Sequence, residues 1–446
     1  MYTTTSNMFK KIKTAILVLV MAAIPGAAWC EEAPDVKITT ERTESSLVEV
    51  AVADFAFEGA DAMGLGPLAA KVIDSDLGFT GFFKPSAEKE LVDLVDRKDR
   101  KTGIVDYESW RSISSNYMIK GKIIPEGDDK ITIEVLVYDL QWRKMDFGKR
   151  YTSTLTMFRQ MLHQFADDFT HQYSGEAGVA RSRIMFVSSI RGRKELMMMD
   201  YDGYNPRQIT TERTLVLSPA WNRANPNLIL FTTYRYRNPD LYVLDLSTKQ
   251  RYPLSTIIGV NSTGEWSPDG TRVAFSISRH GNSDIYIVNA DGRGLKRLTD
   301  LRSAELNPSW SPDGKHIAFT SDMSGTPQIY VMDDQGQGRT RLSFESRYAD
   351  GAAWSPKGDK IAYASLVYGN FDISVRNLKD QAVQLITEGY GKGNNETPSW
   401  APDGRHVVFS SSNSGSRQLY IAGLDGKKPL RVTGLPGGAS QPSWGP

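Results

Sequence analysis

The sequence predicts two folded parts, an α/β (or α+β) domain followed by an all-β propeller of six four-stranded blades. Two observations lead to this prediction. A stretch best represented by PSWSPDG recurs at a nearly constant spacing of about 44 residues, and the segment before its first copy has no repeat but mixes strand and helix patterns. A fixed period of this length is typical of repeat architectures, and 446 residues exceed what one ordinary core holds.

The N-terminus has the three parts of a secretory signal peptide. Lys10, Lys11 and Lys13 precede the apolar run AILVLVMAAI, which is followed by the small residues of PGAAWC. We therefore expect residues 1–30 to be removed and the mature chain to be exported. Cys30 is the only cysteine and follows the bulky Trp29, which argues against lipidation. Cleavage after Cys30 would leave a chain without thiols, as suits an oxidising compartment.

The overall charge gives no electrostatic case for nucleic acid or membrane partners. The 53 Lys and Arg residues nearly balance the 52 Asp and Glu residues, so nothing favours nucleic acid or an anionic membrane surface as a ligand.

Residues 47–174 are expected to form the small α/β domain. VEVAVADF alternates like a strand, GPLAAKVIDSDL has helical spacing, and NYMIKGKIIP and ITIEVLVYDL flank the turn EGDD as in a hairpin. An apolar stripe predicts a last helix, with His163 and His171 on its solvated face. The stripe consists of Met157, Met161, Phe165, Phe169 and Tyr173. The small, polar segment 174–182 is the expected linker to the propeller at 182–446.

Each repeat divides into four short strands joined by turns rich in Pro, Asp and Gly. The repeat tryptophans, which we expect to pack between blades, are Trp221, Trp266, Trp310, Trp354, Trp400 and Trp444. Six apolar second strands also occur, but the first has no tryptophan before it and Trp444 has no strand after it. Both defects disappear if the C-terminal strand joins the strand at 184–189 in one closing blade.

No residue pattern indicates catalysis. The chain has no nucleophile elbow, no HExxH, no CxxC and no phosphate-binding loop, so we expect no catalytic residue, no metal site and no cofactor. His316 and His406 follow the repeat turn, where we expect exposed polar side chains, and His280 lies in a loop. DYDGYN at 200–205 lacks the distal carboxylate of a calcium loop and predicts a hairpin turn.

The two ends of the blades differ in sequence. The turns after the first and third strands share one end, which carries the repeated SPDG, whereas the connections after the second and fourth strands diverge and are rich in Arg, Tyr and Asn. We call the second end the divergent face and expect it to bind a partner.

ARSRIMFVS, DYDGYNPRQIT and the PSWSPDG copies ending in PSWGP resemble the TolB family of periplasmic propellers over essentially the whole mature chain. The resemblance implies a non-catalytic hub in the periplasm that supports outer-membrane integrity and cell division. It further implies that the propeller mouth binds the lipoprotein Pal. The segment 31–46, with Asp35, Val36, Lys37 and Ile38, would bind TolA. Candidate Pal contacts, chosen by loop position, are Arg235, Arg237, Val260, Ser262, Ala304, Glu305, Tyr348, Asp350, Asn394 and Glu396.

The sequence is also compatible with two other functions. An extracytoplasmic propeller enzyme would need clustered base or metal-binding residues at one mouth. A glycan-binding propeller would use exposed aromatic residues such as Tyr234, Tyr236, Tyr348 and Tyr368.

Overall fold

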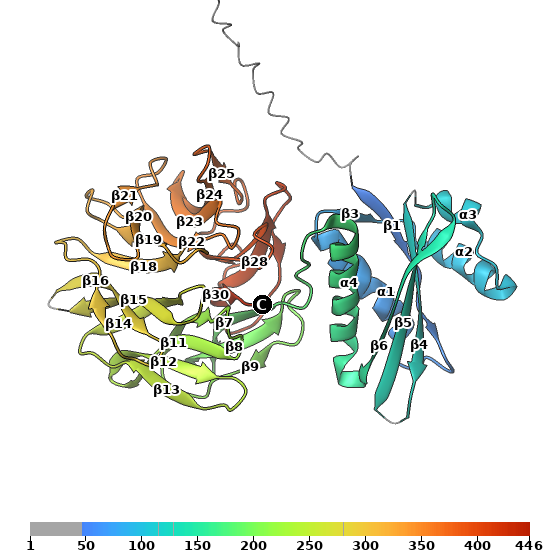
Figure 1. Cartoon of the computed structure of the whole chain (residues 1–446), viewed down its shortest axis with the longest axis horizontal. Helices are drawn as coiled ribbons and strands as arrows, with labels where there is room; N and C mark the ends of the chain where they lie inside the picture. Colours follow the sequence, from blue (N-terminus) through green and yellow to red (C-terminus); the bar gives the residue numbers. More distant parts are fainter. Residues whose placement is uncertain (1–46, 115, 128, 280) are drawn as a thin grey trace, which may run out of the picture. The chain divides into compact units, whose positions relative to one another are not determined.

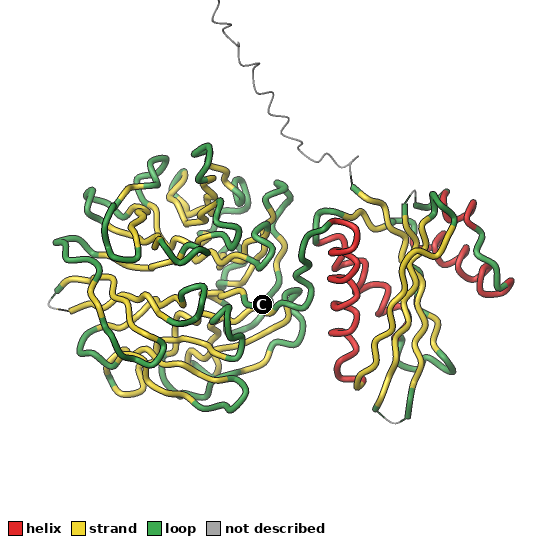
Figure 2. The backbone as a smooth tube through the Cα atoms, in the orientation of Figure 1, coloured by secondary structure: helices red, strands yellow, loops and turns green. Residues whose placement is uncertain are grey.

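The computed structural model describes residues 47–114, 116–127, 129–279 and 281–446. A mixed α/β domain is followed along this part of the chain by a ring of six four-stranded sheets (Figures 1 and 2). The expected signal peptide, Cys30 and the segment 31–46 lie outside the described residues. Within the described ranges, no helix is both long enough and apolar enough to cross a membrane.

The α/β domain contains one six-stranded sheet. Its strands are β1 (Val48–Val52), β2 (Ala56–Phe57), β3 (Phe83–Pro85), β4 (Tyr117–Pro125), β5 (Lys130–Asp139) and β6 (Lys144–Thr154). The order is β3-β1-β4-β5-β6, with β2 also paired to β4. β1 lies parallel to β3 and β4, while β4, β5 and β6 are antiparallel. The strand and the hairpin expected from the sequence are therefore present as β1 and as β4 with β5.

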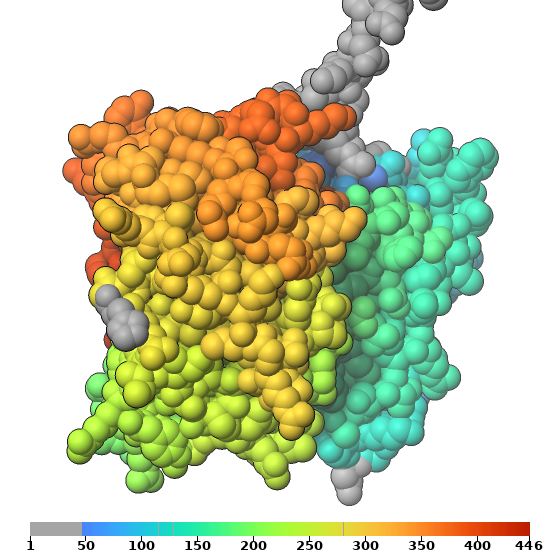
Figure 3. Space-filling model, turned by 60° about the vertical axis from the view of Figure 1, so that its left-hand side comes forward, coloured from blue at the N-terminus to red at the C-terminus, as the bar shows by residue number. Residues whose placement is uncertain are grey.

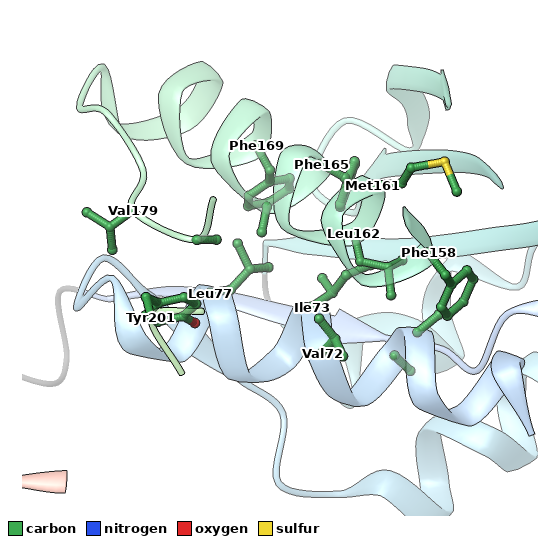
Figure 4. Close-up of a cluster of buried hydrophobic side chains, with 14 of the residues drawn as sticks. Val72, Ile73, Leu77, Phe158, Met161, Leu162, Phe165, Phe169, Val179 and Tyr201 are labelled. Atoms are coloured by element: carbon green, nitrogen blue, oxygen red, sulfur yellow. The ribbon is translucent and has the colours of Figure 1, made fainter. Parts of the chain in front are cut away.

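Helices cover both faces of this sheet (Figure 1). They are α1 (Leu65–Phe79), α2 (Lys89–Thr102), α3 (Tyr107–Arg111) and α4 (Phe158–Ser174), the last preceded by the 3-10 turn η2 (Leu155–Met157). α1 and α4 pack together over one large apolar cluster, in which Leu77 and Phe169 are fully buried (Figure 4). α2 and α3 enclose a smaller cluster around the buried Trp110.

The prediction for the last helix was right for most of its apolar stripe and wrong for Met157 and His163. Met161, Phe165 and Phe169 are buried, whereas Met157 precedes the helix and is 45% exposed. The side chain of His163 is fully buried, with its Nδ1 2.7 Å from a carboxylate oxygen of Asp76. The same Asp76 carboxylate on α1 also accepts a hydrogen bond from the Tyr201 hydroxyl of the propeller, at 2.6 Å. The side of α4 that carries His163 therefore faces α1 and the propeller instead of solvent.

Five blades are each built from four consecutive strands, and each takes its name here from its tryptophan. The Trp221 blade consists of β10 (Val216–Trp221), β11 (Leu228–Tyr236), β12 (Asn238–Asp245) and β13 (Arg251–Ser255), and the Trp266 blade of β14 (Val260–Trp266), β15 (Arg272–Arg279), β16 (Asn282–Asn289) and β17 (Lys296–Arg297). The Trp310 blade consists of β18 (Glu305–Trp310), β19 (His316–Ser321), β20 (Gln328–Asp333) and β21 (Thr340–Arg341), and the Trp354 blade of β22 (Ala349–Trp354), β23 (Lys360–Val367), β24 (Asn370–Asn377) and β25 (Val383–Leu385). The Trp400 blade consists of β26 (Asn395–Trp400), β27 (His406–Ser411), β28 (Gln418–Gly423) and β29 (Leu430–Arg431). Successive blades follow one another across one face, from green through yellow to orange (Figure 3).

The closing blade combines both ends of the propeller, as the sequence predicted. Its order is β30 (Ser440–Trp444), β7 (Arg183–Ile190), β8 (Arg193–Asp200) and β9 (Arg207–Gln208). β30 pairs antiparallel to β7, with Trp444 opposite Ile184. The Trp444 indole also donates a hydrogen bond to the Ser182 hydroxyl at 2.8 Å, just before β7. The C-terminal strand is therefore the innermost strand of the blade that begins the propeller.

Each repeat tryptophan packs against the blade that precedes it in the ring. Trp310, for example, shares an apolar cluster with Ile285 and Ile287 of the Trp266 blade. The prediction that His406 is exposed was wrong. It is 8% exposed, its Nδ1 lies 2.7 Å from a carboxylate oxygen of Asp403, and its ring stacks on Phe79 of α1 at 4.2 Å. The SPDG-type turn of the Trp400 blade is therefore covered by α1, whereas the equivalent His316 is exposed.

Deleting residues 440–446 should open the ring. The deletion removes β30, its pairing with β7 and the buried Trp444, and we expect the free energy of unfolding to fall by more than about 4 kcal/mol. Urea denaturation followed by tryptophan fluorescence measures this change. Deletion of the exposed Pro446 alone is the control, with an expected change below about 0.5 kcal/mol. A truncated chain with the stability of the control would contradict the closing role of β30.

Candidate functional site

The innermost strands of all six blades share a backbone distortion. Each strand has a β-bulge at which one residue, three positions before the tryptophan, adopts a left-handed conformation with φ between 47° and 69°. These residues are Ser218, Thr263, Asn307, Gly351, Thr397 and Gln441. Only one of the six is glycine, although such a conformation costs other residues about 1 kcal/mol or more. Bulges of this kind turn a strand and redirect its side chains.

All six of these residues line one cavity of about 370 Å³, which also borders on residues of all six innermost strands. We call it the axial cavity. At its mouth the lining includes Tyr348 and Phe371, whose rings meet edge to face at 5.3 Å, and the charged residues Asp350, Glu396 and Arg417. Tyr348 and Arg417 lie in connections after a fourth and a second strand, and Asp350, Phe371 and Glu396 are each the second residue of the strand that follows such a connection, so the mouth is on the divergent face.

The carboxylates at the mouth are held in fixed positions. Asp350 accepts hydrogen bonds from the Asn307 amide at 2.7 Å and the Thr320 hydroxyl at 2.8 Å. Glu396 forms an ion pair with Arg417. The mouth therefore presents an aromatic edge beside preorganised charged and polar groups, which are the features of a protein-binding hot spot.

Two charged residues lie deeper, towards the SPDG end of the channel. The Arg223 guanidinium reaches across to the Trp400 carbonyl oxygen on a non-adjacent blade, at 3.2 Å. The carboxylate of Glu265 accepts a hydrogen bond from the Trp310 backbone amide at 3.2 Å. Burial inside the ring raises the pKa of Glu265 to about 7, against the opposing effects of the Ser309 hydroxyl and the Arg223 charge. Burial likewise lowers the pKa of Arg223.

The structure brings together three of the residues predicted from loop position, since Tyr348, Asp350 and Glu396 all line the axial cavity. The others lie outside its lining. Arg235 contacts Glu212 at 3.4 Å, and the Asn394 side chain accepts a hydrogen bond from the Phe371 amide at 3.1 Å. Arg237, between β11 and β12, and Val260, the first residue of β14, are exposed, whereas Ser262 and Ala304 are half-buried.

Glu305 differs from these because its side chain is buried within its blade. It is 0% exposed and accepts hydrogen bonds from the hydroxyls of Ser303 and Ser321. We therefore assign it to the internal structure of the Trp310 blade. The four candidate residues for the second partner, Asp35, Val36, Lys37 and Ile38, lie outside the described residues.

Loop position did not select Phe371, Arg417, Asn307, Arg223 or Glu265. For Arg223 a signal exists in the sequence, since it stands where four other repeats have a proline after Trp-Ser or Trp-Ala. The remaining four have no common sequence feature. Among the described residues, no group of three His, Cys, Asp or Glu side chains is arranged to hold a metal ion.

Two family models match the chain. One, described as the TolB beta propeller domain, matches residues 171–446, and one described as the TolB amino-terminal domain matches residues 34–145. The Tol-Pal system protein TolB of Desulfosudis oleivorans is 34% identical over 199 residues, and that of Nitrosococcus oceani is 30% identical over 228 residues. These alignments cover 45% and 50% of this chain and the same shares of the relatives.

A solved structure resembles the chain over nearly its whole length. The crystal structure of TolB from Acinetobacter baumannii superposes with a TM-score of 0.76 at 25% identity, covering 90% of this chain and 97% of that one. Hydrazine synthase from Kuenenia stuttgartiensis has a TM-score of 0.51 at 14% identity and covers 59% of this chain and 46% of its own, which shows a shared propeller fold only.

The raised pKa of Glu265 predicts a pH-dependent cost in stability. The folded state holds the Glu265 proton more firmly than the unfolded state, so its contribution to stability is lost as pH rises from about 4.5 through about 7. Glu265→Gln keeps an oxygen for the Trp310 amide and removes the charge. The variant should match the parent near the lower pH and be more stable near pH 8, by about 1–3 kcal/mol. Urea denaturation at both pH values measures it, and a pH-independent difference would contradict it.

Proposed function

The chain belongs to the TolB family, and on this premise we propose that it is a non-catalytic, periplasmic protein-binding hub of the Tol-Pal envelope system. Relatives with which it aligns are named as proteins of that system. In this proposal the mouth of the axial cavity binds the lipoprotein Pal, and residues 31–46 bind TolA. Through these two partners the protein would support outer-membrane integrity and constriction at cell division.

The composition of the mouth is the observation that carries the Pal proposal. Six repeated backbone positions form the inner ring, but the side chains around the mouth do not repeat. Tyr348 and Phe371 supply apolar area, while Asp350, Glu396 and Arg417 supply charged groups already held by neighbours. A preorganised polar group loses little side-chain entropy when a partner binds, and aromatic anchors contribute most to such contacts.

For TolA, the alternation in DVKIT supports strand addition as the mode of binding. In this proposal the segment is either docked on its own protein or free. If Pal favours one state and TolA the other, the two sites are coupled. This coupling is part of the proposal and separate from the two binding sites themselves.

Changing the mouth should weaken Pal binding. Tyr348→Ala combined with Asp350→Asn removes the aromatic edge and one charge while leaving the Asp350 site able to accept the Asn307 hydrogen bond. Calorimetric titration with the soluble domain of Pal from the same organism should show at least a tenfold loss of affinity, or about 1.4 kcal/mol.

Lys315→Ala, an exposed residue on an SPDG turn, is the matched control and should bind Pal like the parent. Equal affinities of all three proteins would remove Pal from the mouth. Absence of Pal binding by the parent would contradict the transferred partner and favour a glycan-binding propeller, which peptidoglycan fragments would then test.

Removing residues 31–44 should abolish binding to the TolA domain and leave the thermal unfolding midpoint of the propeller unchanged. Pull-down with TolA and differential scanning calorimetry check the two halves of this expectation. TolA binding that survives the truncation would refute the assignment of the segment. Unchanged Pal affinity in the truncated protein would refute the coupling alone.

A further inference from the structure

A second cavity, of about 590 Å³, lies between the closing blade and the Trp221 blade. Residues of β7, β8 and β9 line it on one side, and residues of β11, β12 and β13 line it on the other. Its volume is within the roughly 300–1,000 Å³ of small-molecule sites. The buried side chains of Met198, Phe231 and Leu244 form an apolar floor.

The charged lining of this cavity is mainly cationic. Arg183, Arg207 and Lys249 all line it, and none of them forms an ion pair within the described residues. The fourth cation, Arg251, is paired with the buried Glu212. Three positive charges therefore remain uncompensated by ion pairs in one cavity.

Arg183 is the most enclosed of the three. It is half-buried, and its guanidinium lies 5.7 Å from the centre of the Trp221 ring. Burial lowers the pKa of Arg183, and the like charge of Arg207 lowers it further, although Asp200 acts in the opposite direction. Two arginines thus face the same space at an unfavourable electrostatic cost, which an anion between them would relieve.

One other blade junction has an arginine at this position, and there the charge is neutralised. Arg272 begins the second strand of the Trp266 blade as Arg183 does in the closing blade, and it covers Trp310 at 4.8 Å. Its guanidinium forms an ion pair with Asp334 at 3.0 Å, directly after β20 of the next blade. The equivalent position after β12, opposite Arg183, is Leu246. The carboxylate is missing at the junction that has the cavity.

One wall of the cavity is fixed by buried hydrogen bonds. The Glu195 carboxylate, which is 3% exposed, accepts hydrogen bonds from the Thr210 hydroxyl at 2.6 Å and from the backbone amide of Glu212 at 3.1 Å. This arrangement holds the segment between Arg207 and Glu212 in place without a ligand. The cationic side chains therefore stand on a preformed scaffold.

We propose that this cavity binds a phosphate monoester attached to an apolar group. The phosphoryl group would lie among Arg183, Arg207 and Lys249, and the apolar group on the floor of Met198, Phe231 and Leu244. A phosphate monoester carries a charge of about −1.5 to −2 at neutral pH and offers three acceptor oxygens, which match three cationic donors. Such a group occurs on small soluble molecules and on lipid headgroups. This site is independent of the partner-binding role of the mouth.

Phenyl phosphate is the probe for the soluble source. Isothermal titration of the full chain at low salt should show saturable binding, at least tenfold tighter than inorganic phosphate because the ring adds apolar contact. Flotation with vesicles of phosphatidic acid, against vesicles of phosphatidylcholine alone, tests the lipid source. Saturable binding of either probe supports the site and identifies its source, and absence of binding to both overturns the proposal.

Leu246→Asp supplies the carboxylate found at the equivalent junction and removes no cation. It should pair with Arg183 and weaken binding of the probe at least tenfold, while Leu246→Asn, the uncharged control of the same shape, should stay within about twofold of the parent. Arg207→Ala with Lys249→Ala, both on the exposed rim, should also lose at least tenfold and covers the case in which Leu246→Asp does not fold. Equal binding by the Leu246→Asp and Leu246→Asn proteins, or by the double variant and the parent, would overturn the assignment.

Discussion

The pairing of β30 with β7 is the interaction on which the rest of the propeller depends. It supplies the missing innermost strand of the closing blade and places that blade against the next, where the Trp221 indole donates a hydrogen bond to the Ser443 carbonyl oxygen at 3.0 Å. A second link lies beside it, since the Ser189 amide donates to the Gly437 carbonyl oxygen at 3.1 Å. Without the pairing of β30 with β7 and these two hydrogen bonds, the innermost strands would not enclose an axial cavity, and its mouth would have no fixed geometry.

The left-handed residues around the axis show the cost that this geometry imposes. Four of the six positions hold Ser, Thr or Gln, which disfavour positive φ. The conformation is nevertheless present in every blade, because the neighbouring strands and tryptophans determine it. Where the innermost strands turn, their side chains are redirected, and Asn307 in this way reaches Asp350 of the next blade. The strain of the scaffold and the order of the mouth thus have the same origin.

The sequence predicted the blade number and the closing strand because both follow from counting, with tryptophans and apolar strands out of phase by one. The burial of side chains where the α/β domain packs on the propeller was not predictable from the sequence. His163 and His406 carry polar patterns typical of solvated faces, yet α1 and the propeller bury them. The left-handed positions share no residue type, so no motif marks them. Leu246 is informative only after alignment by strand register with Asp334.

The pairing of β30 with β7 also determines when the propeller ring can close during synthesis. Because the closing blade contains the first and the last strands of the propeller, the ring cannot form until β30, with Trp444, has been synthesised after the five other blades. A nascent chain can fold blades only as an open arc, with the tryptophan face of its first blade uncovered. Completion of the native ring is therefore a late step in folding, because the strand that closes it follows all the other strands of the propeller in the chain.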